Sequence, residues 1–309
     1  MRTSARTRVA TQAARTTTLQ LAGSGRGRLR GVLFQALLLL CLVIAITTLI
    51  SVLLQSFFQG LPRLDLDLIR NMPSTLDRQT SGMNSAIWGT IYVMAGVIFT
   101  VVPLGLSAAL YLEEFADRRK WYVRLIELNI QNLAAVPSIV FGILGLAFVV
   151  RGPLSLGFVA YAGSLTLSML VLPTVILTAR EALRSVPSSI RQASMGLGAT
   201  KWRTIWHQVL PPAVPGIVTG TILALSRAIG ETAPLLLVGA TVFVTYRPDG
   251  MLSGAYTALP VQIFDWATRP QEEFRILAAA GILVLMVVLI SMNSIAIWIR
   301  NKFTKEWSQ

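Results

Sequence analysis

Residues 31–62 contain no charged side chain and consist mainly of Leu, Val, Ile and Phe. A helix needs about 20 predominantly apolar residues to cross the hydrocarbon core of a bilayer, so residues 32–58 are predicted to form a transmembrane helix. The rest of the chain agrees, because 54% of its 309 residues are hydrophobic and only 13% are charged. This composition is too apolar for an ordinary soluble domain. We therefore expect an all-α, polytopic membrane protein.

Five further apolar segments bring the predicted number of transmembrane helices to six. Residues 59–84 form a polar loop between the first helix and the others. One later segment is longer than a single crossing requires, so its helix is expected to be broken or tilted. The five segments, with this long one fourth among them, are residues 85–112, 127–150, 157–179, 212–245 and 276–299.

The distribution of positive charge predicts the orientation. With six spans both termini lie on one side, which collects nineteen Arg and Lys, whereas the other side collects seven. By the positive-inside rule, the termini and the polar segment 188–208 are cytoplasmic and the loop 59–84 is external. The net charge of +13 could also indicate nucleic acid binding. However, the basic residues cluster between apolar spans, so no nucleic acid partner is expected.

The predicted cytoplasmic tails lie at residues 1–31 and 301–309. The first contains seven Arg and no acidic residue. This composition is typical of an organelle transit peptide or of a tail held by anionic lipid headgroups. The second interpretation is favoured, and it makes membrane lipid a predicted partner. Cys41 is the only cysteine, so an internal disulfide is impossible.

Two short amphipathic helices are predicted within the segment 188–208. Ser189 and Gln192 fit the S-x-x-E/Q capping box, which predicts that the first helix begins there. Gly198 is predicted to end it. Thr200 suits the N-cap of the second helix.

The adjacent Pro211 and Pro212 are predicted to stop that second helix, because proline cannot continue a helix without losing a hydrogen bond. Both prolines also suit the first turn of the next helix. Two such helices between membrane spans could be interfacial anchors. They could instead form a docking surface for a cytoplasmic partner, although the residues alone favour the anchors.

Arg227 is the only basic residue within a predicted span. Its insertion at mid-bilayer costs roughly 2.5–3.5 kcal/mol. Glu231 follows at i, i+4 and can accept a charge-assisted hydrogen bond, while Gly230 and Pro234 would let the helix break nearby. The pair could simply neutralise itself against a neighbouring helix. Alternatively, Arg227 lines a water-accessible path for an anion and Glu231 holds it there.

Motifs of several other functional classes are missing. No G-x-x-x-x-G-K-S/T occurs, so the chain is not expected to bind ATP through a P-loop. His207 is the sole histidine and no Cys or carboxylate cluster stands near it, so a metal site is not predicted. No set of nucleophile, base and orienting residue is visible, so the chain is not expected to be an enzyme. Gly216 and Gly220 form a G-x-x-x-G, which indicates close helix packing, with a partner subunit as one option.

The segment around these features resembles the permeases of importer-type ABC transporters. Their cytoplasmic loop has the pattern E-A-A-x3-G-x9-I-x-L-P, which this chain matches at Ala193, Gly198, Leu210 and Pro211. It differs from the pattern at Gln192, Ser194 and Gln208. A more specific similarity links residues 84–300 to the A-type permease subunit of the phosphate-specific ABC transporter. That similarity is carried by NLAAVPSIVFGILGL, VPSSIRQAS, LGATKW, VLPPAVPGIVTG and SRAIGETAPLLL.

The resemblance implies a five-helix permease core in residues 85–300, preceded by one extra helix. It implies an inner-membrane complex with a second, similar permease, two copies of a cytoplasmic ATPase and an external phosphate-binding protein. ATP would be bound by the ATPase, and this subunit would need no cofactor. Arg227 and Glu231 would lie on the substrate pathway. Contacts with the ATPase would be made by Ser189, Gln192, Ala193, Gly198, Ala199, Thr200, Lys201, Leu210 and Pro211.

Two other functions remain compatible with the sequence. An ion-coupled secondary carrier for anions would need no ATPase, but such carriers often contain inverted repeats with broken helices. The sequence offers one candidate broken helix, at residues 212–245, and no counterpart in the first half. A membrane scaffold or sensor that does not transport would use the basic loop only to recruit a cytosolic protein.

Overall fold

The computed structural model describes residues 25–75, 77, 80–240 and 243–307. Within these ranges the regular structure is helical, and β pairing is limited to an isolated bridge between Ala240 and Tyr256. The predicted all-α class is therefore confirmed. Most of the predicted N-terminal tail, residues 1–24, lies outside the described residues.

The described helices divide into long spans and short connecting pieces. The long helices are α2 (Gly25–Gly60), α4 (Asn84–Leu110), α7 (Ala160–Arg184), α10 (Leu210–Ile229) and α13 (Glu272–Trp307). The shorter α-helices are α3 (Leu66–Arg70), α5 (Trp121–Ala134), α6 (Ser138–Leu144), α8 (Ser188–Gly196), α9 (Lys201–Thr204), α11 (Ala233–Leu237) and α12 (Leu259–Thr268). One 3₁₀ turn, η1 (Leu61–Arg63), and three π-helical turns, η2 (Tyr111–Phe115), η3 (Gly145–Val150) and η4 (Ile205–Val209), complete the set.

Five helical segments are long and apolar enough to cross a membrane. The predicted third span is instead a pair of helices, α5 and α6, that meet at an angle of 108°. Pro137 lies at this break, and it disfavours helical backbone in the preceding residue. The predicted span 127–150 is therefore interrupted by a sharp bend. The count of six holds only if the bent pair is taken as one span.

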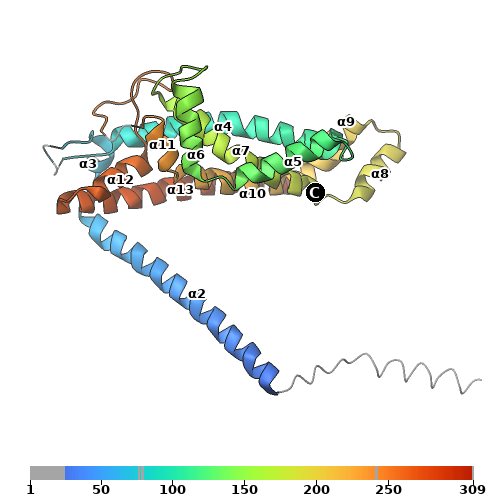
Figure 1. Cartoon of the computed structure of the whole chain (residues 1–309), viewed down its shortest axis with the longest axis horizontal. Coiled ribbons are helices and arrows are strands. Elements are labelled where there is room, and N and C mark those ends of the chain that lie inside the picture. The colour runs from blue at the N-terminus through green and yellow to red at the C-terminus, as the bar shows by residue number, and fades with distance from the viewer. Residues whose placement is uncertain (1–24, 76, 78–79, 241–242, 308–309) are drawn as a thin grey trace, which may run out of the picture. The chain divides into compact units, whose positions relative to one another are not determined.

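The long segment 212–245 is broken, as predicted. Helix α10 ends at Ile229, and the short α11 begins at Ala233. Helix α11 packs against α6 (Figure 1). The two interrupted elements of the chain therefore contact each other.

Helices α4, α7 and α10 form the centre of the bundle that contains residues 56–309. Their shared core includes Val97, Leu167 and Ala228, all buried. The hydroxyl of Ser164 donates to the carbonyl oxygen of Val93 at 3.0 Å and ties α7 to α4. Large apolar side chains such as Phe99 remain exposed on the outside, as expected for a surface that faces lipid.

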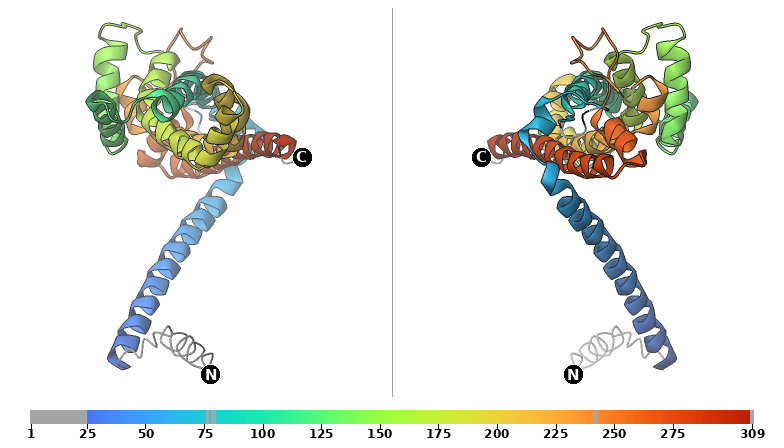
Figure 2. Two further views of the ribbon diagram at one scale, coloured as in Figure 1. Left: turned by 90° about the vertical axis from the view of Figure 1, so that its right-hand side faces the viewer. Right: turned by 90° about the vertical axis from the view of Figure 1, so that its left-hand side faces the viewer.

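The two ends of this bundle carry different elements. Helices α8 and α9 lie at one end, and α3 and α12 lie at the other (Figure 1). Figure 2 looks along the bundle from each end in turn. The predicted docking segment and the predicted external loop therefore occupy opposite ends. Helix α13 continues past the predicted last span into the predicted C-terminal tail, residues 301–309, of which residues 308–309 lie outside the described part.

Candidate functional site

The first helix of the segment 188–208 begins differently from the prediction. Helix α8 starts at Ser188 after Pro187, and no side chain caps it. Pro187 has φ −57° and ψ 138°, so the turn into the helix is made by the proline backbone. The predicted capping box of Ser189 and Gln192 was therefore wrong, because Ser189 already lies inside the first turn.

The junction between α8 and α9 agrees with the prediction. Gly198 follows the end of α8 with φ +87°, a conformation that residues with a β-carbon rarely adopt. Thr200 is the N-cap of α9, where its hydroxyl accepts from the backbone N–H of Arg203 at 3.3 Å. The hydroxyls of Ser194 and Thr204 lie 2.8 Å apart and hold the two short helices together.

The second helix does not stop at the two prolines. Lys201–Ile229 forms one continuous helical segment, with the π-helical turn η4 immediately before Pro211 and Pro212. Both prolines then fall in the first turn of α10, where a missing backbone N–H is tolerated. Their predicted place in the first turn of the next helix is confirmed, whereas the expectation that Pro211 and Pro212 end the preceding helix was wrong. The second helix of the segment 188–208 is instead continuous with a membrane span.

Arg227 and Glu231 lie at the break between α10 and α11. Arg227 Nε donates to Glu231 Oε1 at 3.4 Å, which is long for a charge-assisted bond. The Arg227 side chain is 58% exposed and that of Glu231 is 17% exposed. The guanidinium therefore retains donors that Glu231 does not use, and it lies where another anion could reach it.

Two nearby hydroxyls are occupied by other contacts. Ser226 donates to the carbonyl oxygen of Ile222 at 2.8 Å and contacts Asn293 Oδ1 at 2.6 Å. Thr221 donates to the carbonyl oxygen of Ile217 at 2.8 Å. Both hydroxyls bond to carbonyl oxygens within α10, and that of Ser226 also contacts α13. They therefore add no free donors beside Arg227.

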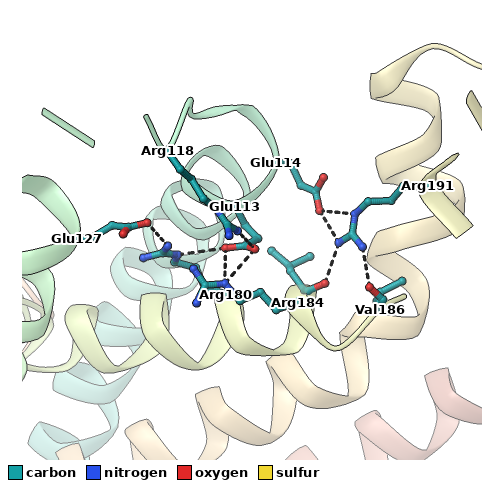
Figure 3. A network of polar contacts seen from close by, with 9 residues as sticks. Glu113, Glu114, Arg118, Glu127, Arg180, Arg184, Val186 and Arg191 are labelled. Atoms are coloured by element: carbon teal, nitrogen blue, oxygen red, sulfur yellow. Dashed lines mark hydrogen bonds and ion pairs between the residues drawn. The ribbon is translucent and has the colours of Figure 1, made fainter. Parts of the chain in front are cut away.

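A network of charged residues, which sequence reasoning did not single out, lies beside α8 (Figure 3). Its carboxylates come from η2 and α5, and its arginines come from α7, α8 and the loop after η2. The signal available in the sequence is the run of acidic then basic residues in 113–120, of which the basic residues contribute to the predicted orientation. The members are Glu113, Glu114, Arg118, Glu127, Arg180, Arg184 and Arg191.

A family model described as the binding-protein-dependent transport system inner membrane component matches residues 101–305. This chain belongs to that family. It is a multi-pass inner-membrane permease, and the match covers most of the bundle, the segment 188–208 and both residues of the Arg227–Glu231 pair.

Curated relatives indicate which type of permease this chain is. The "Phosphate transport system permease protein PstA 1" of Mycobacterium tuberculosis (strain CDC 1551 / Oshkosh) is 37% identical over 228 residues, which is 72% of each chain. The "Phosphate transport system permease protein PstA" of Yersinia pestis is 33% identical over 248 residues, which is 80% of this chain and 82% of that one. The permease is therefore of the PstA type.

A solved structure shows the same fold. One chain of a bacterial alginate ABC transporter, in complex with an alginate pentasaccharide-bound periplasmic protein, superposes with a TM-score of 0.64. The alignment covers 91% of this permease and 98% of that chain at 15% identity. This likeness supports the importer permease fold and carries no information about substrate.

Most residues predicted to contact an ATPase are accessible in the permease. Ala199 and Leu210 are half-buried, and Pro211 is buried within the helix that continues into the membrane. The remaining six residues are exposed, which leaves their side chains available to a partner. They are Ser189, Gln192, Ala193, Gly198, Thr200 and Lys201.

Proposed function

We propose that this chain is a transmembrane subunit of an ATP-driven importer of inorganic phosphate. The observation that carries the proposal is the similarity, over more than two thirds of the chain, to proteins named as phosphate transport system permeases. The subunit forms half of the translocation pathway. The other half comes from a second, similar permease.

Within this importer, the segment 188–208 docks onto a cytoplasmic ATPase. Its accessible surface and its continuity with α10 support this role. A movement imposed on α9 reaches the membrane span without a flexible joint, because Lys201–Ile229 is one helical segment. Two ATPase copies, one for each permease, and an external phosphate-binding protein complete the complex. The termini of this subunit face the cytoplasm.

Arg227 provides the positive charge for phosphate in this pathway, and Glu231 holds the guanidinium between transport events. The long 3.4 Å contact and the exposure of Arg227 support an exchange of partners between Glu231 and phosphate. Arginine suits this role because its planar donors can bind two oxygens of a phosphate at once. Arsenate and other tetrahedral oxyanions would meet the same donors.

A secondary anion carrier is the alternative that a structural feature favours. The bend between α5 and α6 supplies the second interrupted helix that the sequence did not reveal, and carriers often contain such pairs. The family match and the relatives favour the importer instead. A scaffold without transport activity would leave the exposed Arg227 without a role.

A pull-down from mild detergent extract tests the proposal. Recovery of a second permease and an ATPase is expected, and the ATPase activity of the eluate should rise when phosphate-loaded binding protein is added. Binding protein without phosphate is the control. A chain that purifies without an ATPase would overturn the importer and favour the carrier.

A further inference from the structure

Two adjacent carboxylates at the end of α4 are almost fully buried. Glu113 and Glu114 lie on the π-helical turn η2, and their side chains are 5% and 7% exposed. A buried carboxylate is unfavourable unless it is paired and hydrogen-bonded. Glu114 is paired with an arginine of α8, whereas Glu113 is paired with two arginines of α7 and one of the loop after η2. The turn η2 is therefore a junction between separate parts of the bundle.

Glu114 pairs with the arginine of the docking helix. Arg191 lies on α8, and its Nε and Nη2 donate to Glu114 Oε1 at 3.1 and 2.7 Å. The same guanidinium donates to the carbonyl oxygens of Leu183 at 2.8 Å and Val186 at 2.7 Å. Leu183 belongs to α7 and Val186 to the linker that follows it. One side chain of α8 is thus bonded to the ends of both α4 and α7.

Glu113 pairs with arginines of α7. Arg184 Nε donates to both Glu113 oxygens at 3.0 and 2.9 Å, and Arg180 Nε lies 3.5 Å from Glu113 Oε2. Arg180, which is 4% exposed, also contacts Glu127 of α5. Arg118 contacts Glu113 from the loop that follows η2. These contacts fix η2, α5 and α7 relative to one another (Figure 3).

Helix α8 itself has little other attachment to the bundle. It contributes no buried residue, although Ile190 is partly buried against the core beneath it. The Ser194–Thr204 contact joins α8 to α9 and not to α4 or α7. Among the described contacts, Arg191 is the polar side chain that connects α8 directly to the ends of α4 and α7.

We propose that Arg191 and Glu114 form a mechanical joint through which movement of the docking helix α8 reaches α4 and α7. The proposal rests on the proposed function. Arg191 is a positioning residue that touches neither substrate nor ATP. Because its guanidinium is held by four hydrogen bonds to three groups, α8 cannot shift without displacing Glu114 and the end of α7. This path is separate from the continuous helix that links α9 to α10.

The test uses the full complex in proteoliposomes with its phosphate-binding protein. Phosphate imported and ATP hydrolysed are measured together. Arg191→Gln is expected to lower the phosphate imported per ATP roughly fivefold to tenfold, with hydrolysis and subunit composition preserved. Arg191→Lys, which keeps the charge but loses the forked geometry, should fall between Arg191→Gln and wild type. An unchanged ratio in Arg191→Gln would overturn the joint.

A covalent link separates a mechanical role from simple stabilisation. In a Cys41→Ser background, Glu114→Cys and Arg191→Cys are combined and joined with a short bis-maleimide. Before linkage the amount of phosphate imported per ATP hydrolysed should be low. After linkage this ratio should recover, because the tether replaces the ion pair. A ratio that stays low in the linked, assembled complex would overturn the proposal.

Arg269→Gln is the matched control. Arg269 pairs with Asp265 at 2.9 Å at the opposite end of the bundle. The substitution should therefore leave the phosphate imported per ATP unchanged. An equal loss in Arg269→Gln would mean that any broken ion pair reduces the ratio, and it would overturn the specific joint. A wild-type complex without phosphate-stimulated ATPase activity would instead overturn the proposed function.

Discussion

Gly220 of α10 packs directly against Thr178 of α7. A β-carbon added to Gly220 would lie 2.4 Å from the hydroxyl oxygen and 2.5 Å from the β-carbon of Thr178. Gly216, one turn earlier, would place its β-carbon 2.8 Å from that of Ala182 on the same helix. The G-x-x-x-G of the sequence therefore brings α10 against α7 of its own chain.

Gly220→Ala is expected to destabilise the permease by about 1–3 kcal/mol, because the added methyl overpacks the contact with Thr178. The loss is measured as a lower melting temperature in detergent. Adding Thr178→Gly should restore part of it by removing the side chain that the methyl meets. Gly31→Ala, where no atom lies within 4 Å, is the control. An unchanged melting temperature in Gly220→Ala would mean that α10 and α7 separate easily.

The spans were predictable because their signal is local. Charge-free runs such as residues 31–62 must form helices in a membrane, whatever their neighbours are. The break near Glu231 was also predictable, since Gly230 and Pro234 weaken a segment already too long for one crossing. Pro137 carried a similar local signal. However, the sequence did not indicate whether α5 and α6 would continue in one direction or turn by 108°.

The charged network was not predictable, because its partners are distant in the sequence. Glu114 and Arg191 are 77 residues apart, and no periodicity relates them. In the sequence, Glu113 and Glu114 simply follow the predicted span 85–112, and Arg191 is one of several basic residues in the segment 188–208. Only the packing of α4 against α7 brings the two groups together.

Gly198→Asp is expected to uncouple ATP hydrolysis from transport while the protein remains in the membrane. No atom lies within 4 Å of the added β-carbon, and both Asp and Asn tolerate positive φ better than most residues. The defect should therefore arise mainly from the negative charge on the docking surface. It is measured as phosphate imported per ATP hydrolysed.

Gly198→Asn is the matched variant, since Asn has nearly the shape of Asp without its charge. It should retain most of the coupling. Equal loss in both variants would assign the effect to the backbone at φ +87°. Normal coupling in Gly198→Asp would count against ATPase docking at this turn.

Thr200→Ala should weaken the start of α9, because the Thr200 hydroxyl satisfies the backbone N–H of Arg203. Loss of such a cap costs about 1 kcal/mol. The local effect is measured as faster amide hydrogen exchange in residues 201–204. Thr200→Ser keeps the hydroxyl and should exchange at the wild-type rate. Equal exchange in the Ala and wild-type proteins would show that the cap contributes nothing.

Arg227→Gln is expected to reduce phosphate uptake at least tenfold while the complex still assembles, because about 1.4 kcal/mol of lost anion binding already gives that factor. A pair that only neutralised itself would leave uptake intact when the charge is removed together with Glu231. The double variant Arg227→Gln/Glu231→Gln therefore decides between the two roles. It should remain inactive if Arg227 binds the anion, and wild-type uptake would assign the pair a structural role. Arg275→Gln, which removes a basic residue predicted to lie outside the spans, should transport normally.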